Sequence, residues 1–464
     1  MEQAQFFIYH HQKPIQLQAE RAVIYMQGEI IEAYSDNNEL YYLFFYKNHF
    51  LTAAKAIKLR RQSYIEHAFK EGMVFDFPHP FIHALLSSNH PCQMISFKQL
   101  LKKLEMYYSP YEKAFILTFF ESFIPKKQLF NEIKTDFYKY RRNGQLLLGY
   151  QLIRILMDFA PKHSLVKSLA SDMNFNKYAV LYSRKPEEVL ATDGIFAEKI
   201  LYSQLENDIS FQQLIDRLEK EARWIDVIAV TMSKLQITPS IDYYQYLTKL
   251  LDQHFNETET EYILEQLSDQ LPVFLPLQQD LFYNYVKQQK VQKAFTMMNN
   301  HNFKLSHAQV HSFGEMLEIM DLDAHSLRPE VLNSIIKAVI SLFPEKADML
   351  LTKYVISLLK TNELDFIKNW LDSFKEAHGN LQLFEKINTM IKLSESLDQM
   401  NILGELYYEF KQFDKAIECF SWEMELYPSD PKPLQWLAKI YGELGMKHES
   451  DAYRNLCIDL QKWA

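Results

Sequence analysis

Helical periodicity from about residue 60 to the end of the chain is the feature that most limits the fold of these 464 residues. Apolar residues recur three and four positions apart in stretches of about 12–18 residues, as in ISFKQLLKKLEMYY and QLLLGYQLIRILMDFA. Prolines such as Pro110, Pro125 and Pro161 stand at the breaks between stretches. Antiparallel neighbouring helices with short links are the simplest packing for such a string. The pattern predicts a mainly α fold, an α-solenoid in preference to a compact bundle.

The glycine content supports a helical chain and argues against several classes of enzyme. Only 10 glycines occur, where an average composition of about 7% would give about 32. Such a shortage disfavours all-β folds with many tight turns and α/β folds with glycine-rich phosphate loops. With 48% hydrophobic and 23% charged residues, the chain can bury a large core.

The first 58 residues have a different pattern, with short runs rich in aromatic and β-branched residues. QFFIYHH, RAVIYMQ and ELYYLFFYK are separated by turn formers such as SDNN. MQGEII reads as a two-residue hairpin with Gly28 in its turn. We expect a small antiparallel β meander over about residues 4–58, within a first segment 1–58.

Near the other end, LGELYYEFKQFDKAIECFSWEMELYP places small and aromatic residues at defined intervals. The positions are Leu403, Gly404, Tyr407, Phe413, Ala416, Phe420 and the closing Pro428. They are those of the tetratricopeptide repeat, a helix–turn–helix unit of about 34 residues that this segment resembles. Met400 and Glu423 depart from the family pattern, which has Trp and Ala there. Gly404 and Ala416 would allow close helix approach, with Tyr407 and Phe420 filling the space beside them.

The pattern recurs in LQWLAKIYGELGMKHESDAY, one repeat length further on. Leu437, Ala438, Tyr441, Gly445 and Ser450 take the corresponding positions. Residues 397–464 are therefore predicted to form two repeat units, the last helix acting as a cap. The face predicted to form this cap consists of Ala452, Leu456, Leu460 and Trp463.

Upstream the same spacing is weaker. Tyr285 and Ala294 lie nine residues apart, as Tyr407 and Ala416 do, and a helical stretch ends at Pro239. We expect degenerate repeats of this kind over residues 210–396 and a basic helical domain over residues 59–209.

The resemblance implies that exposed residues of each first helix line an inner groove that binds a protein or peptide. The residues at those positions are Asn401, Glu405, Tyr408, Lys432, Gln435 and Lys439. The alternative is that this face is only solvated or packs on another part of the chain.

Charge is divided unevenly along the sequence. Residues 1–185 hold 24 Lys and Arg against 16 Asp and Glu, a formal charge of +8, and the remainder carries −17. The basic half could contact nucleic acid, or the two halves could attract each other. A faint helix–turn–helix pattern in residues 164–185, with Ala170, Asn174 and Val180 followed by Arg184 and Lys185, belongs to the nucleic-acid alternative.

Other candidate sites are sparse. His79, His83, His90 and Cys92 could supply a zinc tetrahedron, but no HExxH or paired CxxC accompanies them. Asp321, Asp323 and His325 lack the spacing of a calcium loop. No GxGxxG, GxxxxGK[ST] or GxSxG occurs, so we predict no catalytic residue, cofactor or metal.

The sequence as a whole predicts a non-enzymatic scaffold, adaptor or regulator that binds a protein or peptide. A peptide-responsive transcriptional regulator that touches DNA through its basic half is the alternative, and an enzyme with a dispersed site is the third. Cys92, Cys419 and Cys457 are few and unpaired in spacing, which is typical of a reducing compartment. The N-terminus lacks a secretory pattern and no run of about 18 apolar residues occurs, so a cytoplasmic protein without a membrane span is expected.

Overall fold

The fold is taken from a computed structural model. It describes residues 5–11, 13–184, 186–290, 343–375, 381–395 and 399–463, with scattered positions between 293 and 341. Contacts divide the chain into two compact units, Met1–Leu277 and Gln278–Ala464. The described residues are mainly helical, with an N-terminal β element, as predicted. The division between the units lies at none of the predicted segment boundaries, residues 58, 209 and 396.

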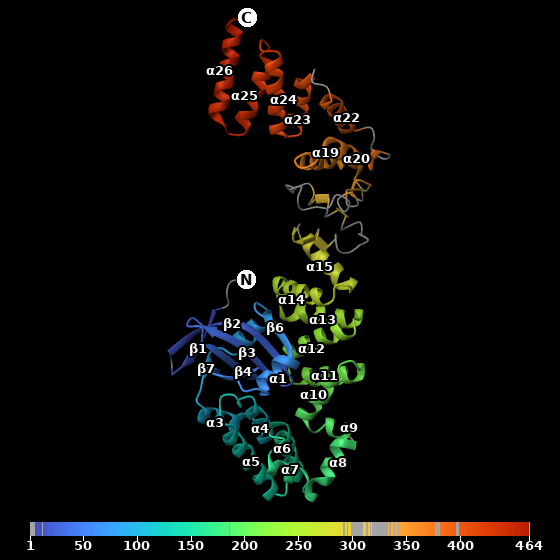
Figure 1. The fold of residues 1–464 in the computed structure, drawn as a ribbon. Coiled ribbons are helices and arrows are strands. Elements are labelled where there is room, and N and C mark those ends of the chain that lie inside the picture. Colours follow the sequence, from blue (N-terminus) through green and yellow to red (C-terminus); the bar gives the residue numbers. More distant parts are fainter. Residues whose placement is uncertain are drawn as a thin grey trace. The chain divides into compact units, whose positions relative to one another are not determined.

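The first unit contains a seven-stranded sheet in the order β5-β4-β3-β2-β1-β7, with β6 also paired to β2 (Figure 1). The strands are β1 (Gln5–His10), β2 (Lys13–Tyr25), β3 (Gly28–Ser35), β4 (Leu40–Tyr46), β5 (His49–Lys55), β6 (Met73–Asp76) and β7 (Cys92–Met94).

The predicted meander is present but is only part of this sheet. Strands β1 to β5 pair antiparallel in sequence order, as expected. Strands β6 and β7 lie beyond residue 58, and β7 runs parallel to β1, so a purely antiparallel sheet confined to residues 1–58 is wrong. The two added strands are only four and three residues long, too short to show an alternating pattern.

The turn between β2 and β3 also differs from its prediction. Tyr25 pairs with Gly28, so the two turn residues are Met26 and Gln27, and Met26 has a φ of 55°. Gly28 instead begins β3, where an added Cβ would lie 2.6 Å from the Tyr64 hydroxyl and 2.9 Å from the Phe119 ring. The residue is glycine because a helix packs directly on the strand there, not because the turn needs it.

Side chains, not a paired strand, bond to the outer edge of β5, and β7 lies beside that edge. The Phe50 amide donates to Asn89 Oδ1 at 2.8 Å. Lys103 Nζ donates to the carbonyls of Phe50 and Leu51 at 2.8 and 3.1 Å. These backbone groups of Phe50 and Leu51 are therefore hydrogen-bonded to side chains and not to another strand.

Helices follow and surround the sheet in the first unit. They are α1 (Tyr64–Glu71), α2 (Pro80–Ser88), α3 (Phe97–Tyr107), α4 (Pro110–Thr118), α5 (Lys126–Arg142), α6 (Leu146–Phe159), α7 (Ser164–Ala170), the 3₁₀ turn η1 (Met173–Phe175), α8 (Asn176–Arg184), α9 (Pro186–Leu190) and α10 (Gly194–Ser203). Ser96 and Ser109 start α3 and α4 with capping boxes. One apolar core joins the sheet to helices α1 and α3 through α10.

A regular series of helices comes next, namely α11 (Asp208–Lys220), α12 (Trp224–Ile237), α13 (Ile241–His254), α14 (Glu257–Gln270) and α15 (Leu275–Lys287). The helices α11, α13 and α15 begin 33 and then 34 residues apart. Figure 1 shows α11 to α14 following one another as a stack of neighbouring helices.

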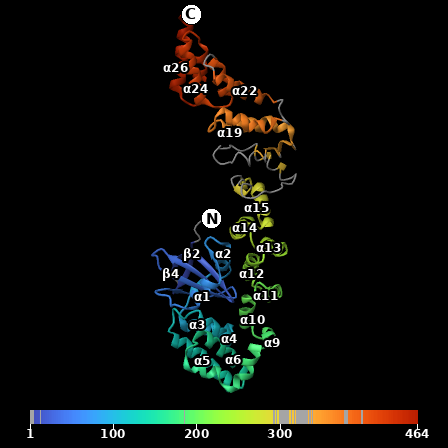
Figure 2. The same ribbon diagram turned by 45° about the vertical axis from the view of Figure 1, so that its right-hand side comes forward.

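The second unit contains α19 (Ala347–Leu358) after the 3₁₀ turn η3 (Pro344–Lys346), then α20 (Leu364–Asp372), α22 (Gln382–Ser394), α23 (Met400–Glu409), α24 (Phe413–Leu426), α25 (Lys432–Glu443) and α26 (Lys447–Trp463). Helices α22 to α26 each pack on the next one in sequence (Figure 2).

One backbone turn recurs between helices in the described parts of both units. A residue with positive φ ends the helix, and the next amide donates back to the carbonyl five residues earlier, as in the Schellman motif. The donor–acceptor pairs are Gln145–Tyr140, Arg223–Leu218, Lys290–Tyr285, Gln412–Tyr407 and Met446–Tyr441, at 2.8–3.0 Å. The positive-φ residues are Gly144, Ala222, Gln289, Lys411 and Gly445. After the turns at Gly144, Ala222, Lys411 and Gly445, a second helix begins within two residues of the positive-φ residue.

Arg223, just after one of these turns, connects the helical series to the sheet. Its side chain is 1% exposed, with Nη1 donating to Glu198 of α10 at 2.8 Å and Nη2 to the Met26 carbonyl at 2.9 Å. Asp226 accepts from Nε at 3.2 Å. Gln27 of the β2–β3 turn donates to Glu198 at 2.7 Å. A buried charged cluster thus fixes the sheet turn against α10 and α12.

Glu29 of β3 is a buried carboxyl next to this cluster. Its carboxylate is fully buried, accepts one bond from the Asn48 amide at 3.1 Å, and leaves Oε1 without a hydrogen-bond partner. Burial, and then the charge of Asp226, hold the pKa of Glu29 well above its usual range. Burial also raises the pKa of Asp226, so burial favours the neutral form of both carboxyls.

Candidate functional site

The α23–α24 hairpin packs as its small and aromatic residues predict. A Cβ on Gly404 would lie 2.9 Å from the Phe420 ring, so the two helices approach closely at this point. Ala416 and Phe420 are fully buried, and Tyr407 is buried beside them. Glu423, where the family pattern has alanine, is also buried and leaves Oε2 without a hydrogen-bond partner.

The α25–α26 hairpin uses the same construction with different contacts. The buried Ser450 hydroxyl donates to the Ala438 carbonyl at 2.7 Å, and the rings of Tyr441 and Tyr453 stack at 5.4 Å. The face predicted to act as a cap does not lie against α25, since Ala452 is exposed and Leu456 is 53% exposed. Packing on α25 instead uses Ser450 and Tyr453, one step around the helix. The side chain of Trp463 lies outside the described ones.

The predicted groove residues lie on two neighbouring helices, three on α23 and three on α25; we call their shared surface the α23–α25 face. Four of the six are exposed, namely Glu405, Lys432, Gln435 and Lys439. Asn401 and Tyr408 are half-buried, and Asn401 Oδ1 has no hydrogen-bond partner.

Tyr408 and Lys439 come together across this face. The Lys439 ammonium lies 4.5 Å from the centre of the Tyr408 ring and 4.6 Å from that of Trp436. The Tyr408 hydroxyl bonds to Glu443, and this bond is the main cause that raises the pKa of Tyr408. Trp436 also stacks on Phe420 at 5.6 Å, which ties the surface cluster to the hairpin core.

Trp436 and Glu443 were missed as members of the site. Both lie on α25 with Lys439, at spacings of three and four residues, so they share one helix face. Extending the predicted set along that face would have found them. Their presence gives the α23–α25 face an aromatic centre with a cation above it and charged residues around it.

The four residues considered for zinc do not form a site. Among the described residues, no three His, Cys, Asp or Glu side chains gather as metal ligands would. Buried His79 caps α2 by accepting from the Phe81 amide at 3.3 Å, and burial lowers its pKa to about 3. Cys92 lies in β7 as a buried free thiol whose pKa burial raises to about 11. His79 is thus a helix cap and Cys92 a strand residue.

The segment considered for DNA binding does not reproduce the spacing of that motif. Val180 would be an interior residue of a helix–turn–helix, yet it is 43% exposed on α8. The buried residues of η1 and α8 are instead Phe175 and Tyr182. Lys185, together with Asp321, Asp323 and His325, lies outside the described residues.

The chemical groups on the α23–α25 face suit recognition. Cys419, buried in the same hairpin, has its pKa raised by burial to about 11, so it is a protonated packing residue at neutral pH. None of the helices in the described part of the chain has the length and apolar character of a bilayer-spanning segment.

Comparisons with known proteins give little further information. No protein-family model matches the sequence, and no curated protein matches it. One similar solved structure is titled "Structure of Naa15/Naa10 bound to HypK-THB", with 12% identity and a TM-score of 0.21. The match covers 78% of this chain and 60% of that one, so this chain spans less than two thirds of its length. A TM-score this low does not establish a shared fold.

Proposed function

We propose that this protein is a non-enzymatic helical-repeat scaffold of the tetratricopeptide type, which binds a protein or peptide segment on the α23–α25 face. The cluster of Tyr408, Trp436 and Lys439 is the observation that carries the proposal. Aromatic rings near the centre of a surface, surrounded by polar side chains, are the usual source of binding energy at protein interfaces.

The repeat architecture supports this proposal in both units. The α11–α15 series has a spacing of 33 and 34 residues, close to that of the tetratricopeptide unit. The recurring turn gives successive hairpins a common geometry. Such arrays expose extended surfaces made from the first helices of their units. Three free, buried cysteines fit a reducing compartment, and we place the protein in the cytoplasm.

A site-specific crosslinking experiment tests the face directly. A photoreactive phenylalanine analogue at Gln435, which is exposed on α25, should capture a partner in cells. The same analogue at Glu418, exposed on α24, should not capture that partner. Adding Tyr408→Ala and Lys439→Ala should remove the Gln435 product by about tenfold or more, because hot-spot truncations cost about 2 kcal/mol or more.

A second pair of substitutions controls for general loss of surface groups. Trp422→Ala with Lys447→Ala also removes one exposed aromatic residue and one exposed lysine, but outside the α23–α25 face. This pair should leave the Gln435 product unchanged. Equal capture at Gln435 and Glu418, or capture that survives the Tyr408 and Lys439 changes, would show that the face is not the binding surface.

A further inference from the structure

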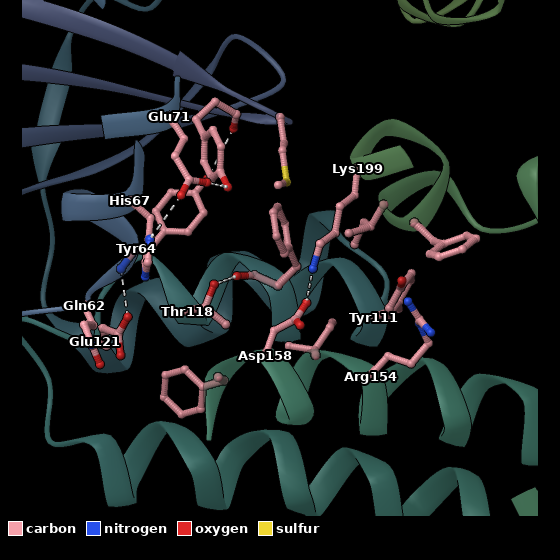
Figure 3. A pocket seen from close by; sticks show the side chains of 17 residues that line it. Gln62, Tyr64, His67, Glu71, Tyr111, Thr118, Glu121, Arg154, Asp158 and Lys199 are labelled. Carbon is pink, nitrogen blue, oxygen red and sulfur yellow. Dashed lines mark hydrogen bonds and ion pairs between the residues drawn. The ribbon is translucent and has the colours of Figure 1, made fainter. Parts of the chain in front are cut away.

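The first unit contains a cavity that the proposed scaffold function does not use. Its volume is about 400 Å³, within the usual range for small-molecule sites. The walls come from α1, α4, α6, α10 and the end of β2, all in one compact unit (Figure 3). Phe115, Ile155, Phe159 and Ile195 supply much of the apolar lining.

Arg154 is the distinctive polar group of this cavity. Its guanidinium lies 4.4 Å from the ring centre of Tyr182 and 4.5 Å from that of Phe196. Among the described residues, no hydrogen-bond or ion-pair partner of Arg154 is found, and Figure 3 draws no dashed line to it. The half-buried Arg154 guanidinium therefore has five N–H donors and no protein acceptor among the described residues.

The aromatic support of Arg154 is held rigidly. Asp193 is 1% exposed and accepts from the hydroxyls of Tyr111 and Tyr182, at 2.8 and 2.6 Å. The same carboxylate caps α10 by accepting from the Phe196 amide at 2.9 Å. One buried residue therefore fixes both rings under the guanidinium, which leaves its edge free to bind a flat anion.

The other charged groups of the cavity already have partners. Lys199 Nζ lies 2.6 Å from Asp158. Glu121 accepts from the Tyr64 amide at 2.8 Å and pairs with Lys126 at 3.1 Å. Glu71 accepts from the Tyr25 hydroxyl at 3.3 Å. Among the described residues of the cavity, Arg154 is thus the positive charge without an ion-pair partner.

We propose that this cavity binds a small organic carboxylate with an apolar body, whose carboxylate forms a bidentate pair with Arg154. The planar guanidinium matches a carboxylate in geometry, and the apolar lining takes the remainder of the ligand. A carboxylate is favoured over a phosphate because Glu71, which has no lysine or arginine partner among the described residues, lines the same space and repels a dianion more strongly than a monoanion.

Isothermal titration of the full-length chain tests the site with defined probes. The carboxylates are acetate, hexanoate, decanoate and 3-phenylpropionate, and the matched controls are 3-phenylpropionamide and phenyl phosphate. We expect affinity to rise from acetate to the larger carboxylates and to be lower for the amide and the phosphate.

Three variants assign the binding to Arg154. Arg154→Gln should weaken carboxylate binding about tenfold or more, since a charge-assisted pair is lost. Arg142→Gln, at an exposed arginine on α5 outside the cavity, should have no effect. Asp158→Asn releases Lys199 and removes a negative charge, so it should strengthen binding about twofold or more.

The outcomes separate this inference from its alternatives. Equal affinity for the acid and its amide, or unchanged binding by Arg154→Gln, would overturn it. Tighter binding of phenyl phosphate would overturn the carboxylate assignment, and no binding by any carboxylate would overturn the site. If Arg154→Gln fails to fold, Asp158→Asn still tests the proposal. Weaker carboxylate binding by that variant would contradict binding of an anion in this cavity. None of these results depends on the α23–α25 face.

Discussion

The turns at residues 218–223 and 407–412 have the same backbone conformation. The side chain of the last residue of each turn, Arg223 or Gln412, makes a different kind of contact. In both, a residue with positive φ, Ala222 or Lys411, precedes an amide that bonds back to the carbonyl five residues earlier. Arg223 then extends into a fully buried charged cluster with Glu198 and the sheet turn. Gln412 instead donates to the carbonyls of Ile356 and Phe410, at 2.8 and 3.0 Å.

The difference shows which part of a helical hairpin is constrained and which part is free. The turn needs only a tolerated left-handed residue and helix formers on either side. The side chain that follows can connect the hairpin to a neighbouring helix with neutral hydrogen bonds, or to another kind of structure through charge. A repeat array can thus join a β sheet without changing its own backbone.

Breaking the charged connection should have the largest effect. Arg223→Met leaves the carboxylate of Glu198 buried without its guanidinium, which should lower the stability of the first unit by about 3–5 kcal/mol. Hydrogen exchange of the β2–β3 turn and of α10 measures this loss. Gln412→Met is the matched change in the second unit and should cost only about 0.5–1.5 kcal/mol, the value of ordinary hydrogen bonds. Equal losses would show that the two turns do not differ as described.

Overfilling the hairpin interior should have the next largest effect. At Gly404 a Cβ would already lie 2.9 Å from the Phe420 ring, so the larger side chain of Gly404→Val should cost about 1–3 kcal/mol. Phe420→Leu should restore part of that stability in urea unfolding of the Gly404→Val protein. Ala438→Gly, at the corresponding place in the next hairpin, should cost only about 0.5–1 kcal/mol through backbone entropy. If Phe420→Leu does not restore stability, steric contact with the Phe420 ring is not the cause of the loss in Gly404→Val.

The charged cluster should also make the stability of the first unit depend on pH. The pKa of Glu29 is higher in the folded state than in the unfolded state. Protonation of Glu29 therefore stabilises the fold fully at pH values below the unfolded-state pKa, and this stabilisation is lost as the pH rises through the folded-state pKa. Glu29→Gln mimics the protonated form. Above pH 5, the free energy of unfolding of this variant should fall less steeply with pH than that of the unmodified protein, by up to about 1.4 kcal/mol per pH unit. Urea unfolding between pH 4 and 8 measures the slope, and a steeper slope in the variant would contradict this assignment.

The smallest expected effect concerns the residue with positive φ that both turns contain. Lys411 has a φ of 54°, a conformation that costs a side chain about 1–2 kcal/mol, partly offset by the unfolded-state entropy of glycine. Lys411→Gly should therefore raise thermal stability by about 0.5–1 kcal/mol. Gly445→Ala, at φ 77°, should lower it by a similar amount. A loss on Lys411→Gly would mean that its side chain has a role outside the turn.

Much of the helical architecture was predictable because it depends on local patterns. The spacing of Leu403, Gly404, Tyr407 and Ala416 predicts a hairpin, and Gly404 packs on Phe420 as expected for close helix approach. The positions of Tyr408 and Lys439 on one face follow from helical periodicity alone, and the structure brings them within 4.5 Å.

The features that escaped prediction depend on residues distant in sequence. Gly28 resembles a turn glycine until the Tyr64 hydroxyl from α1 and the Phe119 ring are placed against it. Arg223 is an ordinary helix-end charge in the sequence, and its partners Met26 and Glu198 come from other elements. The cavity at Arg154 is lined from residue 25 to residue 199, so no local pattern could reveal it.

The filled edge of β5 has a consequence for how this protein can be handled at high concentration. Asn89 and Lys103 occupy the hydrogen-bonding positions of Phe50 and Leu51 that a strand from another molecule would use. An intruding strand would first have to displace both side chains and β7, which lies beside β5. Intermolecular sheet extension at this edge is thereby discouraged in the native state. Removing Lys103 should expose a nucleation point for aggregation.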